Sequence, residues 1–344
     1  MTAQTQASRQ HMVTPSRIEW IMTACQVGRS WRGLVLRGGG HANKTQETMI
    51  SSQAALVQEA IAHFDLKLNS VESVEESYSS VVRILTLESG ECLVLKIPFV
   101  QRKLFRELYA LEHLQGNLPV PQVKDYWIRD DGSPGALLLS LLPGNIITGA
   151  VSMELAFGLG VLLGRLHNHS LEWYGDVYRT EERSPAGWWA TVRRTFESWQ
   201  PLCVEVMPRD LFRKAQDCYA ELYASLPEPD GPCWVHFDYR PGNILVQGAR
   251  ITGLIDFESA RGGSGGLDFV KIQNEVWDVW PGTKEAFLQG YESVRPLPEL
   301  ERSLAFYTLH NAFGGIAWCV KRSRVDDPFF WENMEQLKQL LSAP

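Results

Sequence analysis

The chain has 344 residues, of which 44% are hydrophobic and 21% are charged. This length suits one large or two medium domains, and the composition excludes collagen, a coiled coil and an intrinsically disordered chain. The 33 basic residues against 40 acidic ones leave a formal net charge of −7. That charge disfavours nucleic acid as a partner, because sequence-independent binding needs a basic surface.

Neither a membrane nor secretion is indicated. The longest nearly apolar stretches fall short of the roughly 20 residues of a membrane span, and the N-terminus holds no apolar segment of a signal peptide. The six cysteines form no Cys-x-x-Cys pair, which is typical of reduced thiols rather than of a zinc site or a disulfide framework. We therefore expect a cytoplasmic protein, a monomer or a homodimer, without membrane or nucleic-acid partners.

The first 48 residues differ from the rest of the chain. They carry six basic residues against two acidic ones and show no sustained hydrophobic period. Apolar residues recur at helical spacing only after Met49. We expect residues 1–48 to form a flexible N-terminal extension, and we interpret Met49 as the original start.

Residues 49–143 predict a small lobe made mainly of strands. Two apolar runs, 81–87 and 92–97, flank a turn and predict a hairpin. Phe105, Leu108, Leu111 and Leu114 recur at helical spacing and predict a helix, which ends at a glycine and two prolines. A further apolar strand follows at 135–142.

Residues 146–344 predict a second, mainly helical lobe, joined to the first by a hinge at about 139–145. Leucines over 155–166 form a stripe with the helical period, and the chain from about residue 268 onward reads as helices. Strands and one helix followed mostly by helices predict an α+β fold with two lobes.

The densest group of polar residues lies in CWVHFDYRPGNILVQGARITGLIDF, from position 233 to 257. Asp238 and Asn243 lie on a loop between short apolar runs, and Asp256 follows a predicted hairpin. Oxygen ligands that converge from neighbouring strands suit Mg²⁺. The spacing His-x-Asp-x4-Asn, followed by an apolar strand and Asp, is the arrangement of phosphoryl-transferring kinases. An ordinary hairpin loop is the alternative, because loops favour Asp and Asn.

Two charged residues upstream would complete such a site. Lys96 ends an apolar strand, from which its ammonium group could reach the phosphates of a nucleotide. Glu107 lies on the following helix and could pair with Lys96. Each of them alone reads as a surface charge, and their order before the Asp238 loop favours the functional interpretation.

Six segments in this order carry a resemblance to a known family. They are LVLKI (93–97), RELYALEHL (106–114), LPVPQV (118–123), LGRLHNHS (163–170), HFDYRPGNILV (236–246) and ITGLIDFESA (251–260). Over about residues 70–335 the chain resembles the aminoglycoside phosphotransferase and choline-kinase-like family, small-molecule relatives of protein kinases. The resemblance implies a protein-kinase-like fold with a small, mainly β N-terminal lobe and a larger, mainly helical C-terminal lobe.

The resemblance also implies roles for individual residues. Asp238 would be the catalytic base, and Asn243 and Asp256 would bind Mg²⁺. Lys96 and Glu107 would form the pair on the nucleotide side. The donor would be ATP, with GTP as the alternative.

Other positions are placed less directly. By the same resemblance Asp268, in GGLDF, would brace the catalytic loop, and the adenine would pack against the hinge at Leu141. His167 and His169 lie two residues apart at a predicted helix end, where we expect a cap or a surface position.

The chain departs from the family pattern at several positions. Phe237 stands where relatives commonly have Gly, and Glu258 replaces the Gly of the protein-kinase motif Asp-Phe-Gly. No Gly-x-Gly-x-x-Gly occurs, so the backbone amides of Ser77, Ser79 and Ser80 would cradle the phosphates. The chain has no activation-loop motif Ala-Pro-Glu, which disfavours a protein substrate.

Further charged residues are candidates for the acceptor side. Arg240 would stabilise charge on the transferring phosphoryl group, or would simply be solvated. Glu258, Asp326 and Glu332 belong to the acids of the C-terminal half, where relatives bind their acceptor, and would suit a cationic amino sugar or a quaternary amine. An exposed, charge-laced helix explains Glu332 equally well.

The function predicted from these residues is ATP-dependent transfer of the γ-phosphate to a hydroxyl of a small molecule, first of all an aminoglycoside-type antibiotic. A metabolite kinase acting on choline, homoserine, a fructosamine or a macrolide is the alternative among enzymes. A nucleotide-binding pseudokinase without turnover is the alternative outside enzymes, and the intact Asp238, Asn243, Asp256 and Lys96 argue against it.

Overall fold

The computed structural model describes residues 42–74, 79–184 and 187–342. The chain divides into two compact units, Met1–Met49 and Ile50–Pro344. Most of the predicted extension, residues 1–41, lies outside the described residues, and a helix, α2 (Ala42–His63), begins before Met49. Both sheet-rich and helical lobes belong to the second unit.

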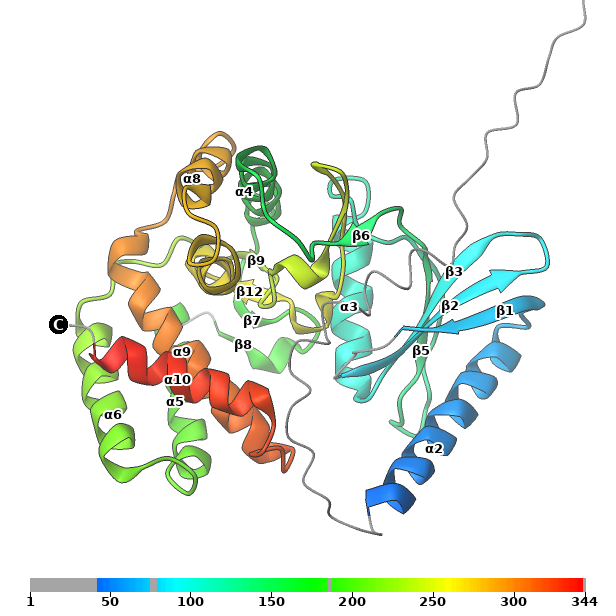
Figure 1. Ribbon diagram of the computed structural model, residues 1–344, viewed down its shortest axis with the longest axis horizontal. Helices are drawn as coiled ribbons and strands as arrows, with labels where there is room; N and C mark the ends of the chain where they lie inside the picture. Colours follow the sequence, from blue (N-terminus) through cyan, green and yellow to red (C-terminus); the bar gives the residue numbers. More distant parts are fainter. Residues whose placement is uncertain (1–41, 75–78, 185–186, 343–344) are drawn as a thin grey trace, which may run out of the picture. The chain divides into compact units, whose positions relative to one another are not determined.

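An antiparallel sheet of five strands forms the N-terminal lobe (Figure 1). Its order is β1-β2-β3-β5-β4, with the bounds Leu68–Ser73 (β1), Ser80–Leu87 (β2), Cys92–Pro98 (β3), Ala136–Ser140 (β5) and Val123–Trp127 (β4). The predicted hairpin is confirmed as β2 and β3, which turn through Gly90 at a φ of 86°. Glycine adopts this conformation without the steric cost that a side chain would add.

The helix α3 (Gln101–Leu114) follows β3 and connects the two lobes through its packing. Its leucines Leu104, Leu108 and Leu111 lie at helical spacing and are buried in the same core as the leucines of α4 (Met153–His167). Figure 1 shows α3 between the five-stranded sheet and the helices of the larger lobe. A shift of α3 would therefore disturb both lobes.

The larger lobe is mainly helical, as predicted. Besides α4 its helices are α5 (Trp188–Cys203), α6 (Arg209–Ala224), the short α7 (Phe269–Ile272), α8 (Thr283–Glu292), α9 (Leu300–Lys321) and α10 (Pro328–Ser342). Ser152 caps α4 by accepting a hydrogen bond from the amide of Leu155 at 3.1 Å. Gly160 of α4 and Gly290 of α8 allow close backbone contact, because a Cβ at either position would overlap a carbonyl of the other helix.

Two small sheets carry the polar loops. One contains β11 (Arg250–Leu254), β10 (Ile244–Gln247) and β6 (Asn145–Ile146), and the other contains β8 (Arg183–Ser184), β7 (Tyr174–Asp176), β12 (Arg261–Gly263) and β9 (Cys233–Val235), each in this order. The sequence predicts the hairpin of β10 and β11. It does not predict the second sheet, because strands of two or three residues are too short for an alternating pattern.

The order of elements confirms the α+β prediction. The chain passes from β5 to β6 through residues 141–144, within the predicted hinge region. None of the described helices is both long and apolar enough to cross a membrane.

Candidate active site

The loop after β9 carries the predicted base and is held by a buried carboxylate. Asp268 accepts hydrogen bonds from the backbone amides of His236 and Phe237 at 2.6 and 2.7 Å. These bonds hold Phe237 at a φ of 69°, a conformation that is costly for a bulky side chain. Glycine would adopt this φ without strain, which accounts physically for the residue expected here from the family resemblance.

His167 lies behind this carboxylate and is fully buried. Its Nε2 is 3.3 Å from Oδ2 of Asp268, and its Nδ1 is 2.9 Å from the hydroxyl of Tyr291 on α8. The expected cap or surface position for His167 is therefore wrong. Leu163 lies one helical turn earlier in the buried stripe, and this spacing was the available signal.

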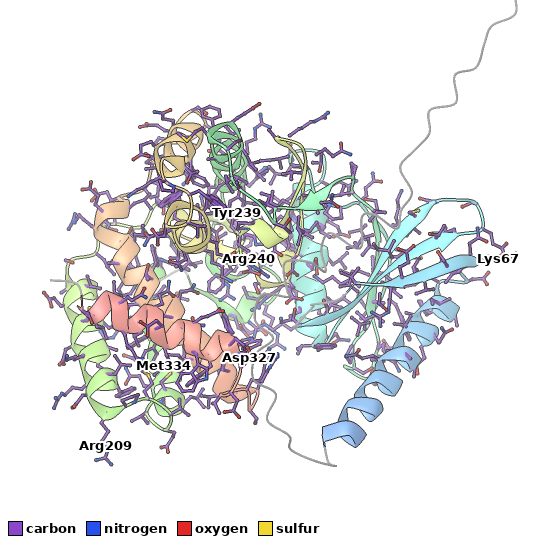
Figure 2. The ribbon with its side chains drawn as sticks, viewed as in Figure 1. Lys67, Arg209, Tyr239, Arg240, Asp327 and Met334 are labelled. Atoms are coloured by element: carbon purple, nitrogen blue, oxygen red, sulfur yellow. The ribbon has the colours of Figure 1, made fainter. Side chains whose placement is uncertain are left out.

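Tyr239 anchors the other side of the loop. Its side chain is buried, and its hydroxyl donates a hydrogen bond of 2.7 Å to the carbonyl of Leu159 on α4. Figure 2 shows Tyr239 and Arg240 below α4 and α8. The loop thus presents Asp238 from a backbone that is fixed on both sides.

The carboxylate of Asp238 is shared by two cations and an amide. Lys271 donates to Oδ1, Nε of Arg240 lies 3.3 Å from the same oxygen, and Nδ2 of Asn243 donates to Oδ2 at 2.9 Å. Burial favours the neutral acid, but Lys271 and Arg240 outweigh burial and hold the pKa of Asp238 well below its usual range. Asp238 is therefore ionised at neutral pH and able to accept a hydrogen bond from a hydroxyl.

Lys96 on β3 lies among three carboxylates. Its Nζ is 2.5 Å from Glu107 on α3, 2.6 Å from Asp256 and 3.7 Å from Glu258. Burial alone would lower the pKa of Lys96, but the carboxylates outweigh burial and raise it above its usual value. The predicted pairing of Lys96 with Glu107 is present, and Lys96 remains charged.

The buried cluster around Lys96 holds more carboxylates than lysines. Lys96 and Lys103 face the three carboxylates of Glu107, Asp256 and Glu258. Burial, together with the neighbouring carboxylates, raises the pKa of Glu107 to about 7 against the attraction of Lys96. Oxygens of the three carboxylates lie within 4.8 Å of one another, so this set fits a divalent cation that would offset their mutual repulsion.

The two predicted metal ligands lie at neighbouring strand ends. The amide of Ile255 donates to the carbonyl of Asn243 at 3.0 Å, which holds Asp256 beside Asn243. The side chain of Asp256 is 29% exposed, against 2% for Glu107, and is therefore more open to a ligand. The side-chain hydrogen bonds described for Asn243 use Nδ2 and leave its carbonyl oxygen for a ligand.

Glu258 belongs to the cluster around Lys96. Its side chain is 5% exposed, one oxygen contacts Lys103 of α3 at 2.5 Å, and the other is the oxygen near Lys96. The position predicted for Glu258, among acids that contact the acceptor, is therefore not the one observed. Glu258 directly follows the loop of Asp256, and the buried turn directs its carboxylate towards α3.

Two residues near Asp238 were not singled out in the sequence, Lys271 and Glu275. Glu275 lies on a π-helical turn, Gln273–Trp277, a distortion often found at functional sites. Crowding by neighbouring atoms and the charge of Asp238 raise its pKa although the side chain stays exposed, and Lys271 and Arg240 oppose that rise. Side chains on a π-helical turn do not follow the α-helical period, so the position of Glu275 could not be predicted from the hydrophobic pattern.

Of the two remaining acceptor candidates, one lies near Glu275. Glu332 is exposed on α10, and its charge adds to the raised pKa of Glu275. Asp326 is exposed in the turn between α9 and α10, next to Asp327, which is labelled in Figure 2. Glu332 thus lies near Glu275, and no contact is described for Asp326.

Three of the residues predicted to contact the nucleotide, Ser79, Ser80 and Leu141, lie among the described residues. Ser77 lies outside the described residues, Ser80 is buried at the start of β2, and the carbonyl of Ser79 accepts from the amide of Phe99 at 2.9 Å. Leu141 follows β5 in the hinge segment and is 40% exposed, as an apolar residue that contacts a ligand would be.

Comparison with known proteins places these residues in a family. The model of the phosphotransferase enzyme family matches residues 70–307. Homoserine kinase of Gluconobacter oxydans is 30% identical over 196 residues, which cover 54% of this chain and 58% of that protein. Homoserine kinase of Phenylobacterium zucineum is 30% identical over 195 residues, covering 53% and 55%. The chain thus matches little more than half the length of these relatives.

Solved structures show the fold. Aminoglycoside phosphotransferase APH(4)-Ia has a TM-score of 0.65 at 18% identity, over 85% of this chain and all of that chain. The GDP complex of wild-type aminoglycoside 2′-phosphotransferase-IIIa has a TM-score of 0.60 at 19% identity, over 84% of this chain and 98% of the other. The predicted two-lobed, protein-kinase-like fold is therefore confirmed.

Proposed function

The chain belongs to the phosphotransferase enzyme family, and from this premise we propose that it transfers the γ-phosphoryl group of ATP to a hydroxyl of a small amine-bearing molecule. The observation that carries the proposal is the arrangement of two charged clusters on either side of Asn243. Asn243 donates to Asp238 at 2.9 Å, and its backbone holds the segment that carries Asp256, the partner of Lys96.

The clusters divide the reaction between them. Lys96 binds phosphate oxygens of the nucleotide, while Glu107 fixes the position of its ammonium group. Asp238 accepts a hydrogen bond from the acceptor hydroxyl and directs its oxygen towards the γ-phosphorus. As the new oxygen–phosphorus bond forms, Asp238 takes the hydroxyl proton, the bond between the γ-phosphorus and the bridging oxygen breaks, and ADP leaves. Arg240, beside Asp238, stabilises negative charge on the transferring group.

Asn243 and Asp256 would hold Mg²⁺, which supplies positive charge to the phosphates. The clustering of three carboxylates around Lys96 supports this part of the proposal. Most of the rate acceleration comes from positioning and electrostatics, because phosphoryl transfer requires little covalent chemistry from the protein.

The acceptor is best matched by a hydroxy amino acid such as homoserine. Lys271 and Arg240 lie beside Asp238 and suit a carboxylate, whereas Glu275 and Glu332 suit an ammonium group. The relatives named homoserine kinase support this choice. A polycationic aminoglycoside ranks second, because Lys271 and Arg240, the cations closest to Asp238, would repel it. Aminoglycosides are still included in the test below, because the similar solved structures are aminoglycoside phosphotransferases.

A coupled assay of Mg²⁺-dependent ATP consumption tests the proposal with L-homoserine, choline, kanamycin and hygromycin B as acceptors. We expect turnover with homoserine, abolished in Asp238→Asn, and weaker or no turnover with the aminoglycosides. The same assay with GTP in place of ATP determines which nucleotide is the phosphoryl donor. Thermal stabilisation by nucleotide without turnover on any acceptor would instead indicate a nucleotide-binding module.

A further inference from the structure

A buried carboxylate outside both clusters lies on β7. The side chain of Asp176 is 1% exposed, and one of its oxygens accepts hydrogen bonds from Arg102 and from Arg106, each at 2.7 Å. Its other oxygen accepts from the backbone amides of Tyr178 and Arg179 at 2.8 and 3.0 Å. Asp176 thus joins α3, which carries both arginines, to a short loop of the C-terminal lobe.

The same face of α3 makes an aromatic contact with that loop. Phe105 stacks on Tyr178, with ring centroids 4.3 Å apart and planes inclined by 5°. Arg102 and Arg106 lie one turn apart, with Phe105 beside them on the helix surface. Glu107 is the next residue, so a displacement of this part of α3 also moves the carboxylate that pairs with the nucleotide-side lysine.

A sheet joins Asp176 to the catalytic loop. In the order β8-β7-β12-β9, Asp176 pairs with Arg261 and Arg261 pairs with Val235, the last residue of β9. The catalytic loop begins directly after Val235. The guanidinium group of Arg261 also lies over the ring of Phe237, 3.8 Å from its centroid, next to the base.

Asp176 also offsets the positive charges of three neighbouring arginines, Arg102, Arg106 and Arg261. Burial and the charges of Arg106 and Arg102 lower the pKa of Arg261 to about 9, and Asp176 opposes that effect. Without the carboxylate, three guanidinium groups would repel one another across the junction of α3 with β12. The negative charge of Asp176, and not only its size, is therefore needed to keep α3 in place.

We propose that Asp176 is a positioning residue that fixes α3 against the sheet β8-β7-β12-β9 and thereby holds the Lys96–Glu107 pair in register with the catalytic loop. Its effect on α3 follows from the contacts alone. Its effect on nucleotide binding and turnover rests on the proposed function.

Hydrogen exchange of the ligand-free full chain tests the effect on α3. In Asp176→Asn, which keeps the size but removes the charge, we expect amides of α3 to exchange at least about 10-fold faster, while those of α6 stay unchanged. Glu182→Gln is the matched control, because Glu182 contacts the same Arg102 but is 36% exposed. We expect that control to change exchange by less than about 3-fold, as for an exposed ion pair.

Titration calorimetry with Mg·ATP tests the coupling to the nucleotide side. We expect Asp176→Asn and Glu107→Gln each to weaken binding by about 10-fold, and the double variant to be little weaker than either, because both changes disturb one pair. Val192→Ala, a buried change on α5, should lower the melting temperature without changing the affinity.

Three results would overturn the proposal. The first is an unchanged exchange rate in α3, and the second is a rise in exchange spread evenly over the whole chain. The third is a double variant whose loss of affinity is the product of the single losses. Arg106→Gln breaks the same contact from α3 and replaces Asp176→Asn should that variant fail to fold. Wild-type protein that does not bind Mg·ATP would refute the proposed function, and exchange alone would then decide the role of Asp176.

Discussion

The two charged clusters of the active site are built in opposite ways. On the proposed acceptor side, Lys271 and Arg240 share the carboxylate of Asp238, and Glu275 is a further acid near both cations. On the proposed nucleotide side, two lysines face three clustered carboxylates, and burial with the neighbouring carboxylates raises the pKa of Glu107. The cations around Asp238 thus hold that carboxylate ionised, whereas the carboxylates around Lys96 repel one another and are suited to receive a cation.

The two clusters also differ in whether they depend on a bound ligand. Asp238 is ionised without any ligand, because the cations that lower its pKa, Lys271 and Arg240, belong to the protein. The ammonium group of Lys96 is occupied by Glu107 and Asp256, and a cation on those carboxylates would free it for phosphate. Each of the following changes removes one charge from one side only.

Asp238→Ala has the largest expected effect. Removal of a positioned base should reduce kcat by at least about 100-fold, and the affinity for Mg·ATP should change little because the nucleotide side keeps its charges. Steady-state kinetics and calorimetry on one preparation measure both quantities. Near-normal turnover would refute the assigned base, and a parallel loss of nucleotide binding would show that the two sides are not separate.

Lys271→Gln tests the acceptor side through pH. The charge of Lys271 holds the pKa of Asp238 below its unfolded value, so this pair stabilises the fold above about pH 4 and the stabilisation is lost as the pH falls towards the folded pKa. We expect the variant to unfold about 10-fold more readily than wild type at pH 7, and the difference to shrink below about pH 4. Thermal unfolding between pH 3 and 7 measures it.

Lys338→Gln is the control for that experiment, because Lys338 and its partner Glu335 are each at least half exposed. Its effect on stability should be small and independent of pH in the same range. A difference between Lys271→Gln and wild type that persists unchanged at low pH would mean that Lys271 acts through packing and not through the charge of Asp238.

Glu258→Gln tests the nucleotide side. It removes one of the three clustered carboxylates, so the Mg²⁺ concentration that half-saturates ATP binding should rise by about 5-fold. Glu335→Gln, an exposed acid of α10, should leave the Mg²⁺ requirement unchanged. An unchanged requirement in Glu258→Gln would contradict the view that the buried cluster is poised for a cation.

The nucleotide side could be predicted from sequence more fully than the acceptor side. Lys96 and Glu107 each follow from a periodic element, a strand and a helix, so their pairing could be expected before the fold was known. Asn243 and Asp256 lie at fixed spacing around one hairpin. Local pattern and order along the chain therefore carried this information.

The rest depends on segments that are distant in sequence. Lys271 reaches Asp238 from a four-residue helix, and Asp176 lies in a three-residue strand whose partner comes 85 positions later, at Arg261. Neither segment is long enough to show a period. The sequence did not predict that Glu258 joins the cluster around Lys96, because the turn that buries it shows no periodic pattern.

Glu275→Gln has the smallest expected effect and sharpens the contrast within the acceptor side. Glu275 is exposed, so its attraction for an ammonium group is screened by water and is worth about 1 kcal/mol at most. We therefore expect KM for an amine-bearing acceptor to rise by no more than about 5-fold, with kcat and the affinity for ATP unchanged. Asp278→Gln, an exposed acid just beyond the π-helical turn, should leave KM unaltered. A fall in kcat instead of a rise in KM would place Glu275 with the reacting groups, and its interaction with Lys271 and Arg240 would then serve the transfer step rather than acceptor binding.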